Sequence, residues 1–136
     1  MSDENVQLAR QVFEAVAQQD SASPLELTHP DVEWRSFFAL GEGEGVYRGH
    51  SGIERYVSDL ADAWEVIDPD IDQAIGLGGV VLLVGRVHYR GRGSGVETAE
   101  SAGWVLKIRD GQVLSFRAFH EPEQALEAAG LPRSST

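Results

Sequence analysis

Two ionisable side chains on neighbouring predicted strands are the strongest candidates for chemistry in this sequence. Side chains alternate between the faces of a strand, so Glu100 shares the apolar face of the strand predicted over 97–108. His120 falls on the apolar face of the next strand, predicted over 112–120. Burial raises the pKa of a carboxylic acid and lowers that of an imidazole, so either group could transfer protons near neutral pH. We therefore predict that His120 is a general acid/base and that Glu100 assists it.

Each of these residues also has a purely structural interpretation. His120 could be a partly solvated histidine at a strand end, hydrogen-bonded to Glu121 or to the closing helix. Glu100 could reach water or pair with Arg90 or Arg92. If both side chains point inward, Glu100 would orient and charge-stabilise the imidazole of His120. Spacing alone leaves these alternatives open.

Aromatic side chains at inward positions outline an apolar cavity around the two candidates. The predicted ligand contacts are Trp34, Ser36, Trp104 and Phe116 from strands, with Phe13, Tyr56 and Trp64 from helices. A cavity of this kind suits a small apolar ligand with one polar handle. Tryptophans at buried positions also occur as plain core residues, and that alternative is kept.

Several chemistries are excluded or disfavoured by composition and spacing. The chain has no cysteine, which removes disulfides, thiolate catalysis and cysteine-bound metal centres. Its four histidines are spread over separate elements with no His-x-His or His-Glu-x-x-His spacing, so we expect no metal site. The glycine-rich stretches lack the strand-to-helix context of a phosphate loop. We expect no cofactor.

The charge balance limits the partners of this 136-residue chain. Asp and Glu number 22 against 11 Lys and Arg, for a formal net charge of −11. Such a domain repels nucleic acid and anionic membrane surfaces. No apolar run approaches the ~20 residues of a membrane span. The acidic, polar start of the chain lacks the features of a signal peptide, so the expected location is the cytoplasm.

We predict a single α+β domain over 1–131, followed by a frayed tail over 132–136. Helices are predicted over 3–19, from Pro24 to about Thr28, over 51–64, and from Glu121-Pro122-Glu123 to Gly130. Strands are predicted over 32–37, 80–90, 97–108 and 112–120, with a flexible connection over 41–50 and an edge or bent stretch over 65–75 at Pro69. Arg109-Asp110-Gly111 is the signature of a hairpin turn. Helices first and long strands afterwards favour helices packed on one face of an antiparallel sheet.

Several motifs in this order resemble one family. They are His-Pro-Asp-Val-Glu-Trp over 29–34, Tyr-Arg-Gly-His-Ser-Gly-Ile over 47–53, Gly-Arg-Gly-Ser-Gly-Val-Glu over 91–97, Arg-Asp-Gly-Gln-Val over 109–113 and Glu-Ala-Ala-Gly-Leu over 127–131. Together they resemble the SnoaL-like branch of the nuclear transport factor 2 superfamily. The resemblance implies a cone-shaped, curved and mainly antiparallel sheet with helices on its concave face, a deep apolar pocket and a homodimer. Ketosteroid isomerase, limonene epoxide hydrolase, scytalone dehydratase and polyketide cyclases share that cone, as do non-enzymatic proteins.

The resemblance also shows which chemistry this chain lacks. The general base of ketosteroid isomerase matches Ser36, its neutral carboxylic acid matches Trp104, and its catalytic tyrosine matches about Phe13. All three roles are therefore unfilled, and steroid isomerisation is not expected. The Asp-Arg-Asp set of limonene epoxide hydrolase is not recognisable. SnoaL-like polyketide cyclases use an acid/base on a late strand, a role that His120 could take.

Two functions follow from these observations. The first is a SnoaL-like protein that binds a small apolar metabolite and acts on it by acid/base isomerase, cyclase or hydrolase chemistry. The alternative is a non-catalytic ligand-binding or association domain of the same fold. A homodimer is expected through the outer face of the sheet, where charged and apolar side chains mix. That face carries Arg86, His88, Arg90, Arg117 and Phe119.

Overall fold

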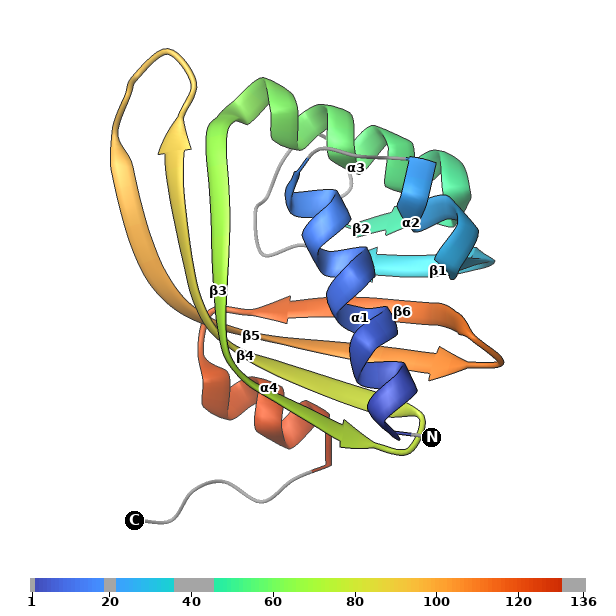
Figure 1. Cartoon of the computed structure of the whole chain (residues 1–136). Coiled ribbons are helices and arrows are strands. Elements are labelled where there is room, and N and C mark those ends of the chain that lie inside the picture. The colour runs from blue at the N-terminus through green and yellow to red at the C-terminus, as the bar shows by residue number, and fades with distance from the viewer. Residues whose placement is uncertain (1, 19–21, 36–45, 131–136) are drawn as a thin grey trace.

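The computed structural model describes residues 2–18, 22–35 and 46–130, which form one curved sheet with helices packed against it (Figure 1). The helices are α1 (Ser2–Ala17), α2 (Ala22–Leu27), α3 (Gly49–Ala63) and α4 (Pro122–Ala128). The strands are β1 (Thr28–Arg35), β2 (Val46–Arg48), β3 (Trp64–Leu77), β4 (Val80–Gly91), β5 (Glu97–Arg109) and β6 (Gln112–Phe119). This is the α+β cone that the sequence predicted.

The six strands lie in the order β2-β1-β6-β5-β4-β3, and only the pairing of β1 with β6 is parallel among these described strands. Short hairpins join β3 to β4 and β5 to β6. In the second hairpin Asp110 and Gly111 both have positive φ, 54° and 75°, the backbone that a tight two-residue turn requires. The hairpin predicted at Arg109-Asp110-Gly111 is therefore confirmed.

The sheet bends sharply along β3, β4 and β5 and encloses α1 and α3 (Figure 1). The register of β3 against β4 shifts between Ile71 and Gln73. Gly85 lies opposite this irregularity, and a Cβ there would collide with the backbone carbonyl of Asp70. A bulge of this kind increases the local bend and twist of a strand. The close approach of β3 to Gly85 therefore helps to close the cone.

The main core fills the concave face of the sheet. α1 buries Ala9, Val12, Phe13 and Val16, a three- and four-residue spacing that places all four on one side of the helix. α3 buries Ile53, Tyr56, Val57 and Leu60 in the same way. α1 packs against β3 and β4, whereas α3 packs mainly against β1 and β2. The same core cluster includes inward residues of β4 and β5, namely Val81, Leu83, Trp104 and Leu106. Each large side chain buried here contributes about 1.5–3 kcal/mol to folding.

One helix, α4, lies on the opposite face of the sheet from α1 and α3 (Figure 1). α4 packs against β5, where Ala125 joins a second apolar cluster with Leu82 and Val105. The strands need this cover because β4 and β5 are apolar on both faces at these positions. Gly103 permits the close approach, because a Cβ there would lie 2.5 Å from the Cβ of Ala125. α4 thus occupies part of the face predicted to form a dimer, and the dimer itself stays a prediction.

The boundaries of two predicted elements change in the structure. The helix predicted over 51–64 begins at Gly49 and ends at Ala63, so Trp64 opens β3 instead of closing a helix. β1 begins at Thr28, earlier than the strand predicted over 32–37, and its pairing with β6 is irregular between Thr28 and Glu33. Part of the predicted connection over 41–50 forms β2. The extended stretch around Pro69 lies at the sheet edge, as predicted.

Candidate functional site

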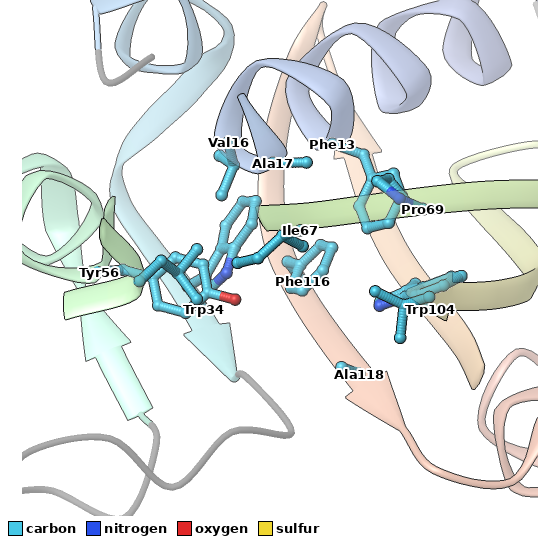
Figure 2. A pocket seen from close by; sticks show the side chains of 12 residues that line it. Phe13, Val16, Ala17, Trp34, Tyr56, Ile67, Pro69, Trp104, Phe116 and Ala118 are labelled. Carbon is cyan, nitrogen blue, oxygen red and sulfur yellow. The ribbon is translucent and has the colours of Figure 1, made fainter. Parts of the chain in front are cut away.

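An apolar pocket lies between the concave face of the sheet and helices α1 and α3 (Figure 2). Its total empty space, including the part open to solvent, is about 420 Å³, of which about 40 Å³ admits the centre of a water molecule. The lining residues are Phe13, Val16, Ala17, Trp34, Tyr56, Leu60, Ile67, Pro69, Val87, Trp104, Phe116 and Ala118. The pocket is therefore narrow, and aromatic side chains form much of its wall.

The aromatic wall is built by strand pairing. Trp34 of β1 lies directly opposite Phe116 of β6, and their rings stack with centroids 3.9 Å apart and planes 9° apart. Phe13 of α1 packs on Trp104 with a centroid distance of 4.6 Å and on Phe116 at 6.2 Å. Tyr56 of α3 contacts Trp34 at 5.7 Å. Three strands (β1, β5 and β6) and two helices (α1 and α3) thus fix these five rings relative to one another.

The polar atoms of the pocket are few. Trp34 is 0% exposed, and its indole Nε1 finds no hydrogen-bond partner among the described residues. Tyr56 brings a hydroxyl group to the same region, and Figure 2 shows its oxygen beside the Trp34 ring. Within the described ranges no carboxylate, imidazole or basic side chain lines this pocket. Its chemistry is therefore that of an aromatic binding site with a hydrogen-bond donor.

A surface depression adjoins the pocket between the end of α1 and β3. It shares Ala17, Ile67 and Pro69 with the pocket and adds Glu14, Gln18 and Asp68. The exposed carboxylates of Glu14 and Asp68 make this approach acidic. Anionic molecules are repelled along such a route, whereas uncharged ones are not.

Glu100 lies on the concave face at one side of the pocket. It is opposite Val87, which lines the pocket, and accepts a 2.7 Å hydrogen bond from the hydroxyl group of Tyr89. Burial raises the pKa of Tyr89 to about 12, and the hydrogen bond and charge of Glu100 act in the same direction. Tyr89 therefore remains a donor to Glu100 at neutral pH. The alternative partner Arg90 instead lies near Glu97, with 3.4 Å between its Nε and Oε1.

His120 follows the last residue of β6 and is exposed. Trp104 pairs with Ala118, so a longer β6 would pair Ala102 with His120 and place His120 on the concave face. β6 ends at Phe119, one residue before His120. His120 does not contribute to the pocket lining described above. The catalytic roles assigned to His120 and Glu100 stay predictions.

Five of the predicted ligand contacts meet at the pocket. They are Phe13, Trp34, Tyr56, Trp104 and Phe116. Trp64 lies outside it and packs edge-on against Tyr89, with ring centroids 4.6 Å apart. Ser36 is outside the described residues.

Sequence reasoning did not name the β3 side of the pocket, formed by Ile67 and Pro69. These residues share odd numbering with Ile71, so alternation along 65–75 carried the signal that could have identified them. Ala118 shares the alternation of Phe116, and Val87 shares that of Tyr89, so the strand pattern also places these two lining residues, which were not named as ligand contacts. The prediction favoured large aromatic residues and passed over the small and aliphatic ones.

The described residues give no support for a metal centre or a membrane span. No group of three or more His, Asp or Glu side chains in ranges 2–18, 22–35 and 46–130 is arranged to hold a metal ion. Over the same ranges, every helix is too short or too polar to cross a bilayer.

A curved sheet that encloses an apolar pocket beneath two helices defines the nuclear transport factor 2-like class of cone-shaped proteins. Residues 9–116 match the model of the SnoaL-like domain family, and the chain belongs to that family. A comparison with curated proteins gave no match.

Solved structures with this fold extend over nearly the whole chain. A nuclear transport factor 2-like protein of unknown function from Burkholderia pseudomallei aligns with a TM-score of 0.75 and 18% identity, covering 93% of this chain and 97% of that one. TerC, co-crystallised with polyporic acid, aligns with a TM-score of 0.74 and 19% identity at the same coverages. A Shewanella denitrificans protein assigned as a SnoaL-like polyketide cyclase has a TM-score of 0.74 and 17% identity, covering 95% and 97%. At these identities the comparisons establish the fold alone.

Proposed function

We propose that this protein binds a small, uncharged, aromatic molecule in the pocket of the cone. The chemistry of the pocket wall carries this proposal, because the described lining has five aromatic rings and no ionised side chain. Apolar pockets with a few placed polar groups are the usual form of small-molecule sites. TerC, which has the same fold, was crystallised with polyporic acid, and this supports a ligand site in a cone of this kind.

The narrowness of the pocket constrains the shape of the ligand. Only about 40 Å³ admits the centre of a water molecule, although about 420 Å³ of empty space lies between the lining residues and solvent. A flat molecule fits such a space with the smallest displacement of side chains. Planar rings also stack favourably on indole and phenyl faces, which contributes about 0.5–1.5 kcal/mol per pair beyond area burial.

The proposal can be tested with the uncharged fluorescent probe N-phenyl-1-naphthylamine. Its emission rises in apolar surroundings, so titration of the protein should give a saturable signal with one site per chain. Ala118→Leu adds apolar volume inside the pocket, opposite Trp104. We expect it to weaken binding at least about tenfold, because the pocket has little spare room.

Ala99→Leu provides the matched control, since Ala99 is exposed on β5 and lies outside the pocket lining. It should leave the affinity for the probe unchanged. Absence of saturable binding, or equal affinities in the wild type and Ala118→Leu, would contradict the proposed function. Circular dichroism spectra and unfolding midpoints of both variants would verify that they fold.

A second candidate function is acid/base catalysis on a bound carbonyl compound. The pair formed by Tyr89 and Glu100 favours it, because this carboxylate lies one strand away from the pocket residue Val87. The test is exchange of the α-hydrogens of 1-indanone in D₂O, followed by NMR. Catalysis should accelerate exchange over buffer, and Glu100→Gln or His120→Ala should abolish the acceleration. Exchange at the buffer rate with bound 1-indanone would exclude this function for such ketones.

A further inference from the structure

We infer that the indole N–H of Trp34 is the polar anchor of the ligand and donates a hydrogen bond to an uncharged carbonyl oxygen. The inference rests on the proposed function and makes it more specific. The expected ligand is a planar molecule with a neutral hydrogen-bond acceptor. Trp34 would make the site prefer such a molecule over a hydrocarbon of the same shape.

The first argument is the unmet hydrogen-bonding capacity of Trp34. Its side chain is fully buried, and Nε1 has no acceptor among the described residues. Indole nitrogen is a donor only, and buried donors in folded proteins nearly always have partners. An unpaired donor in the wall of an otherwise apolar pocket is therefore explained if a ligand supplies the acceptor.

The second argument is that the Trp34 ring cannot turn to find another partner. It is stacked on Phe116 at 3.9 Å on one side and contacts Tyr56 at 5.7 Å. Its strand position pairs with Phe116 in the sheet, which fixes the backbone as well. The nitrogen is shielded from water, so the ligand must separate lining side chains to reach it. Any ligand must move these side chains apart in any case, because the pocket is too narrow to admit one without such movement.

The third argument concerns charge. The described lining offers no basic side chain to neutralise an anion, and the adjoining depression carries Glu14 and Asp68. The formal net charge of the chain is −11. Desolvating an anion in such surroundings is costly, whereas a carbonyl oxygen accepts from indole N–H without an ionic charge. The favoured acceptor is therefore a ketone, quinone, lactone or amide oxygen.

The test compares 1-indanone with indane, two bicyclic molecules that differ only by the carbonyl group. The chain has three tryptophans, so ¹H–¹⁵N spectra contain three indole N–H signals that single Trp→Phe variants assign. We expect 1-indanone to move the Trp34 signal downfield, as hydrogen bonding requires. Indane should perturb pocket signals without that downfield shift. The anionic 1-oxoindane-5-carboxylate should bind more weakly than 1-indanone.

Affinities in two variants give an independent measure. Trp34→Phe removes the donor, and Trp104→Phe removes a similar volume from the same pocket while leaving the Trp34 donor in place. Because a neutral hydrogen bond changes an equilibrium by a modest factor, Trp34→Phe should lower the ratio of 1-indanone to indane affinity about fivefold. Trp104→Phe should leave this ratio unchanged. Using a ratio cancels the different hydrophobicities of the two molecules.

The outcomes separate this inference from the proposed function. Suppose that both molecules bind, that 1-indanone does not shift the Trp34 signal, and that Trp34→Phe does not change the affinity ratio. The role of Trp34 as hydrogen-bond donor is then wrong, and the proposal of an apolar binding site is retained. If neither molecule perturbs the pocket and N-phenyl-1-naphthylamine also fails to bind, the proposed function fails and the anchor fails with it. Tighter binding of the carboxylate than of 1-indanone would overturn the assignment to uncharged acceptors.

Discussion

Trp34 and Phe116 stack face to face across the parallel pairing of β1 with β6, with their ring centroids 3.9 Å apart. This pairing joins β1 and β2 to the rest of the sheet through β6, the last strand in the sequence. The two rings form one wall of the pocket. Stability and binding are therefore linked at this contact. A change to either ring alters the core and the ligand site together.

Phe116→Ala should destabilise the protein by about 3–5 kcal/mol, the usual loss when a buried phenyl ring is deleted. Phe116 is only 3% exposed and contacts both Trp34 and Phe13. Urea unfolding followed by circular dichroism measures the effect. Phe119→Ala is the comparison, because Phe119 on the same strand is only partly buried against the α4 cluster and should cost less. Equal losses in the two variants would contradict the central position given to Phe116.

Gly103→Ala should displace α4 from the sheet. The added Cβ would lie 2.5 Å from the Cβ of Ala125 and 3.3 Å from the Cα of Pro122. Overpacking of this kind typically costs about 1–3 kcal/mol. Ala125→Gly removes the clashing methyl group, so the double variant should be more stable than the sum of the two single losses predicts. A double-mutant cycle by chemical unfolding measures this coupling, and strict additivity would argue against the contact.

The stability of the protein should fall as the pH rises from about 10 to 12. Burial raises the pKa of Tyr89 from 10.0 to about 12, so the folded chain keeps a proton that the unfolded chain loses. The stabilising contribution is complete below pH 10 and declines by about 1.4 kcal/mol per pH unit as the pH approaches 12. Denaturant unfolding at several pH values should therefore give a shallower decline in Tyr89→Phe. An identical slope in this variant would contradict the shift of the Tyr89 pKa.

His120→Ala should leave the affinity for N-phenyl-1-naphthylamine unchanged. His120 is exposed beyond the end of β6 and does not line the pocket in the described structure. Fluorescence titration at neutral pH provides the measurement, with Ala118→Leu as the positive control for loss of binding. A weakening of more than about threefold would indicate that His120 reaches the ligand.

Local sequence patterns predicted most of the elements because their causes are local. The spacing of Val12, Phe13 and Val16 requires a helix with one buried side, and Asp110-Gly111 supplies the positive φ angles of a tight hairpin. Alternation along the strands placed Trp34, Trp104 and Phe116 inward, and the structure brings all three to the pocket. The family resemblance then implied that these elements pack as a cone around an apolar pocket.

Contacts between distant segments were beyond such patterns. Alternation placed Glu100 inward but could not show that Tyr89, on the neighbouring strand, binds its carboxylate. It likewise placed His120 inward, although β6 ends one residue earlier. Apolar residues on both faces of β4 and β5 indicate two covered surfaces, but only packing decides that α4 covers the second one.

Local patterns along the chain therefore predict most of the elements, their buried sides and the aromatic character of the pocket, because these depend on neighbours within a few residues. Tertiary structure decided which inward side chains share one pocket, since that depends on strand register, the bend at Gly85 and the approach of α1. It also left the Trp34 nitrogen without a partner among the described residues. Whether a buried donor has a hydrogen-bond acceptor depends on residues distant in the sequence, because only the fold determines which of them lie nearby.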